Sequence, residues 1–296
     1  MDKMRKFKEL LYSSETHYII DAHNALIAKI VEETNFPAIW GSGLTLSASK
    51  GTRDCNELSY TQVLDELELM SDATNIPIFV DGDTGYGNFN NFRRFVKQLC
   101  RLGIAAVSIE DKIFPKLNSF LDRHQELADI NEFCGRIKAG KDAQTNSDFS
   151  IVARTEAFIC GKSLQEALDR ASAYIEAGAD AIIVHSKSNT ANEVLEFAKC
   201  WNNYSPLIVI PTKYYQTPAV EFIKAKIAIV IWANHNLRAI VSAVRKNAQQ
   251  IYHENGVINV ENQIANLDEI FKLVRDDELK QSEQIYLNYS HIKEES

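Results

Sequence analysis

The chain has 296 residues, of which 45% are hydrophobic and 24% are charged, and its formal net charge at pH 7 is −8. These values are typical of a compact soluble protein that can bury a large core. The acidic balance and the scattered lysines and arginines argue against nucleic acid as a partner, and no stretch is long and apolar enough to span a membrane. The first residues also lack the apolar segment of a secretory signal, so we expect a cytoplasmic protein.

Eight short apolar runs recur along the chain, and helical spacing follows them. The runs lie at residues 17–24, 38–43, 77–83, 105–111, 150–156, 180–186, 206–212 and 227–235. Most of them are continuously apolar, which is typical of parallel strands buried on both faces. The alternation predicts an α/β fold, a TIM-type (β/α)8 barrel that forms a single domain over residues 1–296. A doubly wound open sheet is the alternative.

Two further helices are predicted after the eighth run. Residues 237–256 have the spacing of one helix, and residues 267–287 add another that a barrel does not itself require. We expect this C-terminal helix to pack on a neighbouring helix or on another subunit.

Polar residues stand at the ends of nearly all the predicted strands. Among them are Asp21, His23, Asp81, Asp83, Glu110, Arg154, His185, Thr212 and Asn234. In TIM barrels the reacting groups lie at the carboxyl ends of the strands, where the βα loops begin. So many ionisable groups at one rim indicate a functional site and not packing alone.

Three of these acids have the spacing of a metal site. Asp81 and Asp83 are two residues apart on a strand and project from the same side, and Glu110 ends the next strand. Ligands that are all oxygen suggest Mg²⁺ or Mn²⁺. The alternative is that one aspartate caps the following turn and the other pairs with a basic neighbour.

Arg154 and His185 are candidate anion-binding residues. A cation at the end of a buried strand needs an anionic partner, which for Arg154 is either a bound anion or an acid such as Glu156. His185 is likewise either a donor to an anion or a histidine with a structural hydrogen bond.

The turn after the second strand could bind an oxygen atom. It offers the hydroxyl of Ser42 and the consecutive backbone amides of Gly43 and Leu44, which suit a carboxylate or phosphoryl oxygen.

A long polar loop follows the fourth strand. Residues 110–127 show no helical spacing, and such spacing begins only at about residue 129. Loops of this length are often lids, and we expect residues 112–124 to close over a ligand. Lys116 and Asn118 would then bring a cation and an amide onto it.

Several motifs in the same order resemble the phosphoenolpyruvate mutases of the isocitrate lyase and phosphoenolpyruvate mutase superfamily. They are WGSGLTLSASKGTRD, DGDTGYGNFNNFRR, SIEDKIFPKLNS, VARTEAFICG, AGADAIIVHSK and IWANHNLRA. The resemblance covers nearly the whole chain. It implies interconversion of phosphoenolpyruvate and 3-phosphonopyruvate with Mg²⁺ as cofactor. It also implies a homodimer or homotetramer in which the helix at residues 267–287 is exchanged between subunits.

The resemblance further implies roles for single residues. The family's metal-binding acids correspond to Asp81, Asp83 and Glu110 of this chain. Asp81 would bind the metal directly, and Asp83 and Glu110 would act largely through water. The turn that binds the substrate matches Trp40, Ser42, Gly43 and Leu44. An aspartate near the reaction centre matches Asp54, and the residues that handle the phosphoryl group match Arg154, His185, Lys116, Asn118 and Ser119. One departure is Gly82, where the family more often has alanine.

Three other functions compete with the mutase. Phosphonopyruvate hydrolase shares the fold and the metal acids, but the K-x-N-S pattern at residues 116–119 favours the mutase. Lyases of the isocitrate type carry a K-K-C-G-H pattern that residues 110–119 lack. An inactive barrel that only binds a ligand would be favoured by loss of a metal acid or of Lys116, and these residues are present. The sequence therefore predicts the mutase.

Overall fold

The computed structural model describes residues 2–121 and 123–287. Its eight parallel strands follow one another in sequence order around a closed barrel. The strands are β1 (His17–Asp21), β2 (Ile39–Gly41), β3 (Ile78–Asp81), β4 (Ala106–Glu110), β5 (Ser150–Thr155), β6 (Ala181–Val184), β7 (Leu207–Val209) and β8 (Ile229–Trp232). The pairing of β1 with β8, with Ile19 opposite Ile231, closes the sheet. The (β/α)8 prediction is thus confirmed, and the open sheet is excluded.

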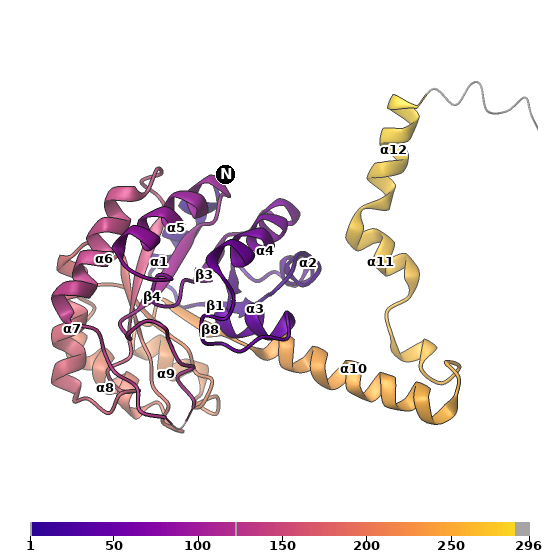
Figure 1. The fold of residues 1–296 in the computed structure, drawn as a ribbon. Coiled ribbons are helices and arrows are strands. Elements are labelled where there is room, and N and C mark those ends of the chain that lie inside the picture. Colours follow the sequence, from indigo (N-terminus) through magenta and orange to yellow (C-terminus); the bar gives the residue numbers. More distant parts are fainter. Residues whose placement is uncertain (1, 122, 288–296) are drawn as a thin grey trace, which may run out of the picture. The chain divides into compact units, whose positions relative to one another are not determined.

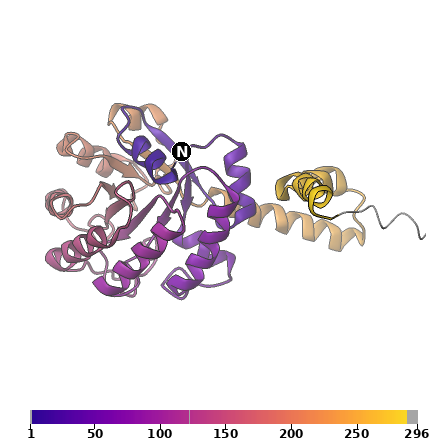
Figure 2. The same ribbon diagram turned by 90° about the horizontal axis from the view of Figure 1, so that it is seen from above.

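Helices surround the strands, as Figure 1 and the view from above in Figure 2 show. They are α2 (Ala25–Glu33), α3 (Gly43–Ser49), α4 (Tyr60–Ala73), α5 (Phe89–Arg101), α6 (Ile130–Ala143), α7 (Leu164–Glu176), α8 (Asn192–Trp201) and α9 (Ala219–Lys224). No helix among the described residues is long and apolar enough to cross a membrane.

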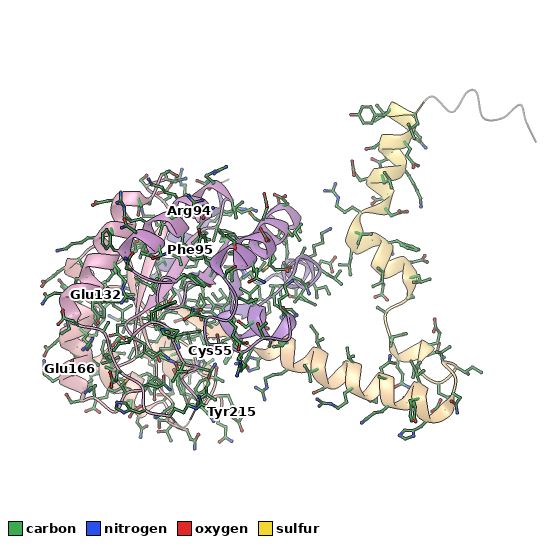
Figure 3. The ribbon with its side chains drawn as sticks, in the orientation of Figure 1. Cys55, Arg94, Phe95, Glu132, Glu166 and Tyr215 are labelled. Atoms are coloured by element: carbon green, nitrogen blue, oxygen red, sulfur yellow. The ribbon has the colours of Figure 1, made fainter. Side chains whose placement is uncertain are left out.

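The core lies between the strands and the inner faces of these helices. On α5, Phe92, Phe95 and Leu99 are fully buried, whereas Arg94 is exposed beside Phe95 (Figure 3). Burying one such apolar side chain contributes roughly 1.5–3 kcal/mol. The 3.6-residue spacing in the sequence therefore gave the correct inward face of this helix.

An N-terminal helix, α1 (Lys3–Leu11), covers the opposite end of the barrel from the predicted site. Phe7 is fully buried against Phe79, with ring centroids 5.0 Å apart. Lys6 and Lys8 donate to carbonyl oxygens of Asn75 and Ser147, which precede strands. Because this helix closes the amino ends of the strands, the carboxyl ends are left for the site.

The chain divides into two compact units, residues 1–238 and 239–296. Helix α10 (His235–Glu254) confirms the prediction of one helix there, and a short 3₁₀ turn, η1 (Glu261–Gln263), follows. The prediction of a single domain over residues 1–296 stays a prediction.

The prediction of one helix over residues 267–287 is wrong. Two helices occupy this range, α11 (Leu267–Val274) and α12 (Asp276–Tyr286). Arg275 separates them because its backbone is left-handed, with φ of 63° and ψ of 43°. The first turn of α12 contains three acids, and their negative charge stabilises the N-terminus of that helix. The apolar spacing of residues 267–274 stops at the charged run of residues 275–278, and the prediction of one helix extended the spacing across it.

Candidate active site

A cavity lies at the carboxyl ends of the strands, where the sequence predicted the site. Ten of the predicted residues line it: Trp40, Ser42, Leu44, Asp54, Asp81, Lys116, Asn118, Ser119, Arg154 and His185. The remaining three, Gly43, Asp83 and Glu110, are buried and do not line it. Residues from distant parts of the chain meet here because every strand of a parallel barrel ends at the same rim.

The turn after β2 approaches the acids closely. Ser42 is the N-cap of α3, and Gly43 is the first residue of that helix. A Cβ atom at Gly43 would lie 2.8 Å from Asp83 Oδ1 and 3.3 Å from Asp81 Oδ2. Glycine is therefore needed for this approach, and the first amides of α3 have no partner within the helix.

The β3–β4 ladder brings the three acids together. It continues past β3, because Gly82 N donates to Ser108 O over 2.7 Å and Glu110 N donates to Asp83 O over 2.7 Å. Asp83 takes a left-handed backbone, with φ of 51°, and its N–H donates to Asp81 Oδ1 over 3.1 Å. The predicted acids are thus neighbours, and all three are buried.

Lys116 from the long loop enters this acidic cluster. Its Nζ atom lies 2.5 Å from Asp83 Oδ1 and 2.8 Å from Asp54 Oδ1. For Lys116, burial lowers the pKa, but Asp54 and Asp83 outweigh burial and hold it well above its usual value. Lys116 is therefore a cation at neutral pH.

Arg154 pairs with acidic side chains, the second of the two kinds of partner that the sequence left open. Its Nε atom donates to Glu156 Oε1 over 2.5 Å, and its Nη atoms lie 3.4 Å from Glu110 Oε2 and 3.6 Å from Asp81 Oδ2. Burial alone would raise the pKa of Glu156, but Arg154 and His185 hold it well below its usual value. The ion pair with Glu156 fixes Arg154, which still lines the cavity.

His185 presents one ring nitrogen to Glu156 and the other to the cavity. Its Nδ1 atom lies 2.7 Å from Glu156 Oε1 and 2.9 Å from Arg154 Nη2. Its Nε2 atom is buried and has no hydrogen-bond partner. Burial and the charge of Arg154 lower the pKa of His185, so the imidazole is neutral at pH 7.

The loop between β4 and α6 lies over the cavity. Lys116 and Ser119 are buried, and Asn118 Nδ2 donates to Asp54 Oδ2 over 2.7 Å. Lys112 Nζ donates to Leu117 O over 2.6 Å and to Ser119 Oγ over 2.9 Å, which holds the loop in this arrangement. The predicted lid at residues 112–124 includes residue 122, which lies outside the described residues.

Two polar residues of this site, Asn56 and Lys112, have no role predicted from the sequence. Asn56 Nδ2 donates to Asp83 Oδ2 over 2.8 Å, and its Oδ1 accepts from Lys116 N over 2.8 Å. Lys112 Nζ lies 3.3 Å from Glu110 Oε1 and 3.4 Å from Glu156 Oε2. Lys112 follows the acids of β4 and could have been found from that position. Asn56 has no such signal, because its left-handed turn is set by tertiary contacts.

The acids fit a divalent cation by their chemistry. In the described part of the chain, no three His, Cys, Asp or Glu side chains form a ready metal-binding group. Both carboxylate oxygens of Glu110, and Asp83 Oδ1, are buried and make no hydrogen bond, and their only partners among the described residues are the ion pairs with Lys112, Arg154 and Lys116. Buried carboxylate oxygens with unused lone pairs are costly, and a hard cation with oxygen ligands would satisfy them. Asp81, Asp83 and Glu110 are therefore the residues that could hold Mg²⁺.

Comparison with known proteins identifies the family. The model of the family described as phosphoenolpyruvate phosphomutase matches residues 7–252. The phosphoenolpyruvate phosphomutase of Tetrahymena pyriformis is 54% identical over 286 residues, covering 96% of this chain and 95% of that protein.

Solved structures agree with this match. The crystal structure of phosphoenolpyruvate phosphomutase from Streptomyces platensis subsp. rosaceus has a TM-score of 0.93 and 43% identity, covering 95% of this chain and 98% of that one. A phosphonopyruvate hydrolase in complex with oxalate and Mg²⁺ has a TM-score of 0.92 and 38% identity, covering 97% of this chain and 100% of that one. The chain therefore belongs to the phosphoenolpyruvate phosphomutase family.

Proposed function

We propose that this chain is a Mg²⁺-dependent phosphoenolpyruvate phosphomutase, an isomerase that interconverts phosphoenolpyruvate and 3-phosphonopyruvate. The observation that carries the proposal is one cavity that joins a buried acidic cluster to cationic and neutral donors. The acids are Asp81, Asp83 and Glu110, and the facing donors include Arg154 and Asn118. The high identity to phosphomutases over nearly the whole chain supports the same reaction.

The reaction moves phosphorus within one molecule. The P–O bond to the enol oxygen breaks, and the methylene carbon of the resulting enolate donates the electron pair for the new P–C bond. No proton is gained or lost at these atoms. Because phosphoryl transfer needs little covalent help, the protein's task is to position the parts and to stabilise charge.

The chain's own residues divide this task. When bound, Mg²⁺ would stabilise negative charge on the oxygens of the pyruvate enolate. The hydroxyl of Ser42 and the amides of Gly43 and Leu44 would bind substrate oxygens at the β2 side. Arg154 and Asn118 would hold the oxygens of the phosphoryl group while it is between carbon and oxygen.

A phosphonopyruvate hydrolase would differ from the mutase only in transferring the phosphoryl group to water. Water would have to reach it, and the loop that carries Lys116 and Ser119 buries both side chains over the cavity. This enclosure supports the mutase over the hydrolase. Release of inorganic phosphate and pyruvate as the main products from phosphonopyruvate would favour the hydrolase instead.

We also propose that the C-terminal unit packs on a second copy of the chain. In residues 239–287, Val260 is the one buried residue, while Leu267, Phe271 and Ile285 are 47–71% exposed. On the barrel, the β1 and β8 residues Tyr18 and Trp232 are half-buried. Apolar helices without a core of their own need a partner surface. Exchange of these helices in a dimer, or a tetramer of dimers, would supply it.

A small anionic substrate and a cytoplasmic location are part of the same proposal. The cationic side chains of Lys116 and Arg154 line the cavity and suit a small anion. All five cysteines are free, which suits a reducing compartment such as the cytoplasm.

A further inference from the structure

The side of the cavity formed by β6, β7 and β8 carries polar atoms that the reaction described above leaves unused. Three of them are His185 Nε2, Thr212 Oγ1 and Asn234 Oδ1, each buried and without a hydrogen-bond partner. All three residues line the same cavity. Buried polar groups in native proteins are normally paired, so an unpaired set around one cavity points to a ligand that supplies the partners.

The strand order places these groups beside the proposed phosphoryl site. Arg154 lies on β5 and His185 follows β6, and β7 and β8 come next around the barrel. Thr212 follows β7 and Asn234 follows β8. The turn that would bind the carboxylate follows β2, and the acids Asp81 and Glu110 end β3 and β4. Because β7 adjoins β6, Thr212 lies at the strand end next to that of His185. Asn234 lies one strand further round, after β8, which pairs with β7 and β1.

The chemistry of the two side chains suits an anionic phosphoryl oxygen. The Thr212 hydroxyl can donate one hydrogen bond, and Asn234, whose unpaired atom is the acceptor Oδ1, can donate to an anion only through its NH₂ group. Neither group is charged, so neither would hold the phosphoryl group too firmly to let it move. Ile210 and Ala233, which also line the cavity after β7 and β8, are apolar, so Thr212 and Asn234 are the polar lining residues after these two strands.

We infer that Thr212 and Asn234 are further substrate-contacting residues that bind oxygens of the phosphoryl group during its transfer. This inference rests on the proposed function. If the inference is correct, removing either side chain lowers kcat/KM for a substrate that carries a phosphoryl group. The same change leaves the binding of a ligand without a phosphoryl group unchanged.

The test compares phosphonopyruvate with oxalate, which has carboxylates but no phosphoryl group. Thr212→Val is expected to lower kcat/KM for phosphonopyruvate by about 10- to 100-fold, as for loss of a hydrogen bond to a charged group. Asn234→Ala is expected to do the same. Inhibition by oxalate in the presence of Mg²⁺ is expected to stay within about twofold of wild type, because oxalate needs only the carboxylate side.

Controls separate this role from folding. Thr212→Ser keeps the hydroxyl and is expected to retain activity within about threefold. Thr217→Val changes a threonine of the same β7–α9 segment that does not line the cavity, and it is expected to behave as wild type.

Two results would overturn the inference: kcat/KM unchanged in Thr212→Val and Asn234→Ala, or oxalate inhibition lost in parallel with activity. If one variant fails to fold, the other decides the question together with Thr212→Ser. Failure of the wild-type protein to convert phosphonopyruvate would instead refute the proposed function, and the inference with it.

Discussion

Replacing Glu156 with glutamine is expected to lower both stability and activity. This carboxylate contacts Arg154 and His185 of the site and also Ser119 of the loop between β4 and α6. Its Oε1 atom accepts from Arg154 Nε over 2.5 Å and lies 2.7 Å from His185 Nδ1. Its Oε2 atom accepts from Ser119 Oγ over 2.5 Å. Glutamine keeps the shape and one acceptor oxygen, but its NH₂ group must face side chains that themselves donate.

The size of the effect follows from these contacts. Loss of one hydrogen bond to a charged group costs about 1.5–3 kcal/mol, and loss of one partner of a buried ion pair costs about 3–5 kcal/mol. Arg154 keeps Glu110 and Asp81 at 3.4 and 3.6 Å, which offsets part of this loss. We therefore expect the free energy of unfolding to fall by about 2–4 kcal/mol. Turnover should fall roughly 10- to 100-fold, because Arg154 and His185 lose the group that orients them.

The effect should also depend on pH. The folded protein holds the pKa of Glu156 well below its usual value, so the carboxylate's contribution to stability is complete above the unfolded pKa, about 4.3. It is lost as the pH falls from there toward the folded pKa. The stabilities of wild type and Glu156→Gln should therefore converge in acid.

Urea unfolding followed by circular dichroism measures stability, and conversion of phosphonopyruvate measures activity. Glu166→Gln is the matched control, because Glu166 on α7 (Figure 3) accepts from Arg170 Nε over 2.8 Å but is 37% exposed. Exposed pairs are worth about 0–1 kcal/mol, so this variant should change little. A Glu156→Gln protein with wild-type stability and turnover would refute the reasoning.

Three further predictions concern the metal, the loop and the assembly. Asp81→Ala should abolish turnover at any practical Mg²⁺ concentration, whereas Glu110→Gln should mainly raise the Mg²⁺ needed, as a magnesium titration of activity would reveal; full activity after treatment with EDTA would contradict the metal assignment. Asn118→Ala removes the amide that donates to Asp54 and should both slow the reaction and release some inorganic phosphate, measured in a phosphate assay; a wild-type rate without phosphate would remove Asn118 from the mechanism. Truncation after Asn255 should cause aggregation or dissociation, seen by size exclusion with light scattering; an unchanged native mass would count against helix exchange.

The fold was predictable because its signals are local and repeated. Continuous apolar runs mark strands buried on both faces, and the 3.6-residue period marks the inward faces of helices such as α5. The break at Arg275 was missed, because the prediction extended the apolar spacing of residues 267–274 across the charged run at residues 275–278. Strand ends were also predicted too long, since the pattern cannot show where pairing stops.

The site was predictable where function depends on position at a strand end. Asp81, Glu110, Arg154 and His185 all follow this rule. The partners that hold them were harder to predict. Glu156 was expected only as one possible partner of Arg154, yet it also accepts from Ser119 of the loop, 37 residues away. Contacts of this kind depend on loop packing that no sequence period encodes.

The most direct test of the account is phosphorus NMR of phosphonopyruvate incubated with the protein and Mg²⁺. The phosphonate signal is expected to be replaced by that of phosphoenolpyruvate, without inorganic phosphate, and EDTA is expected to stop the conversion. Inorganic phosphate as the main product, or a phosphonate signal that stays unchanged, would contradict it.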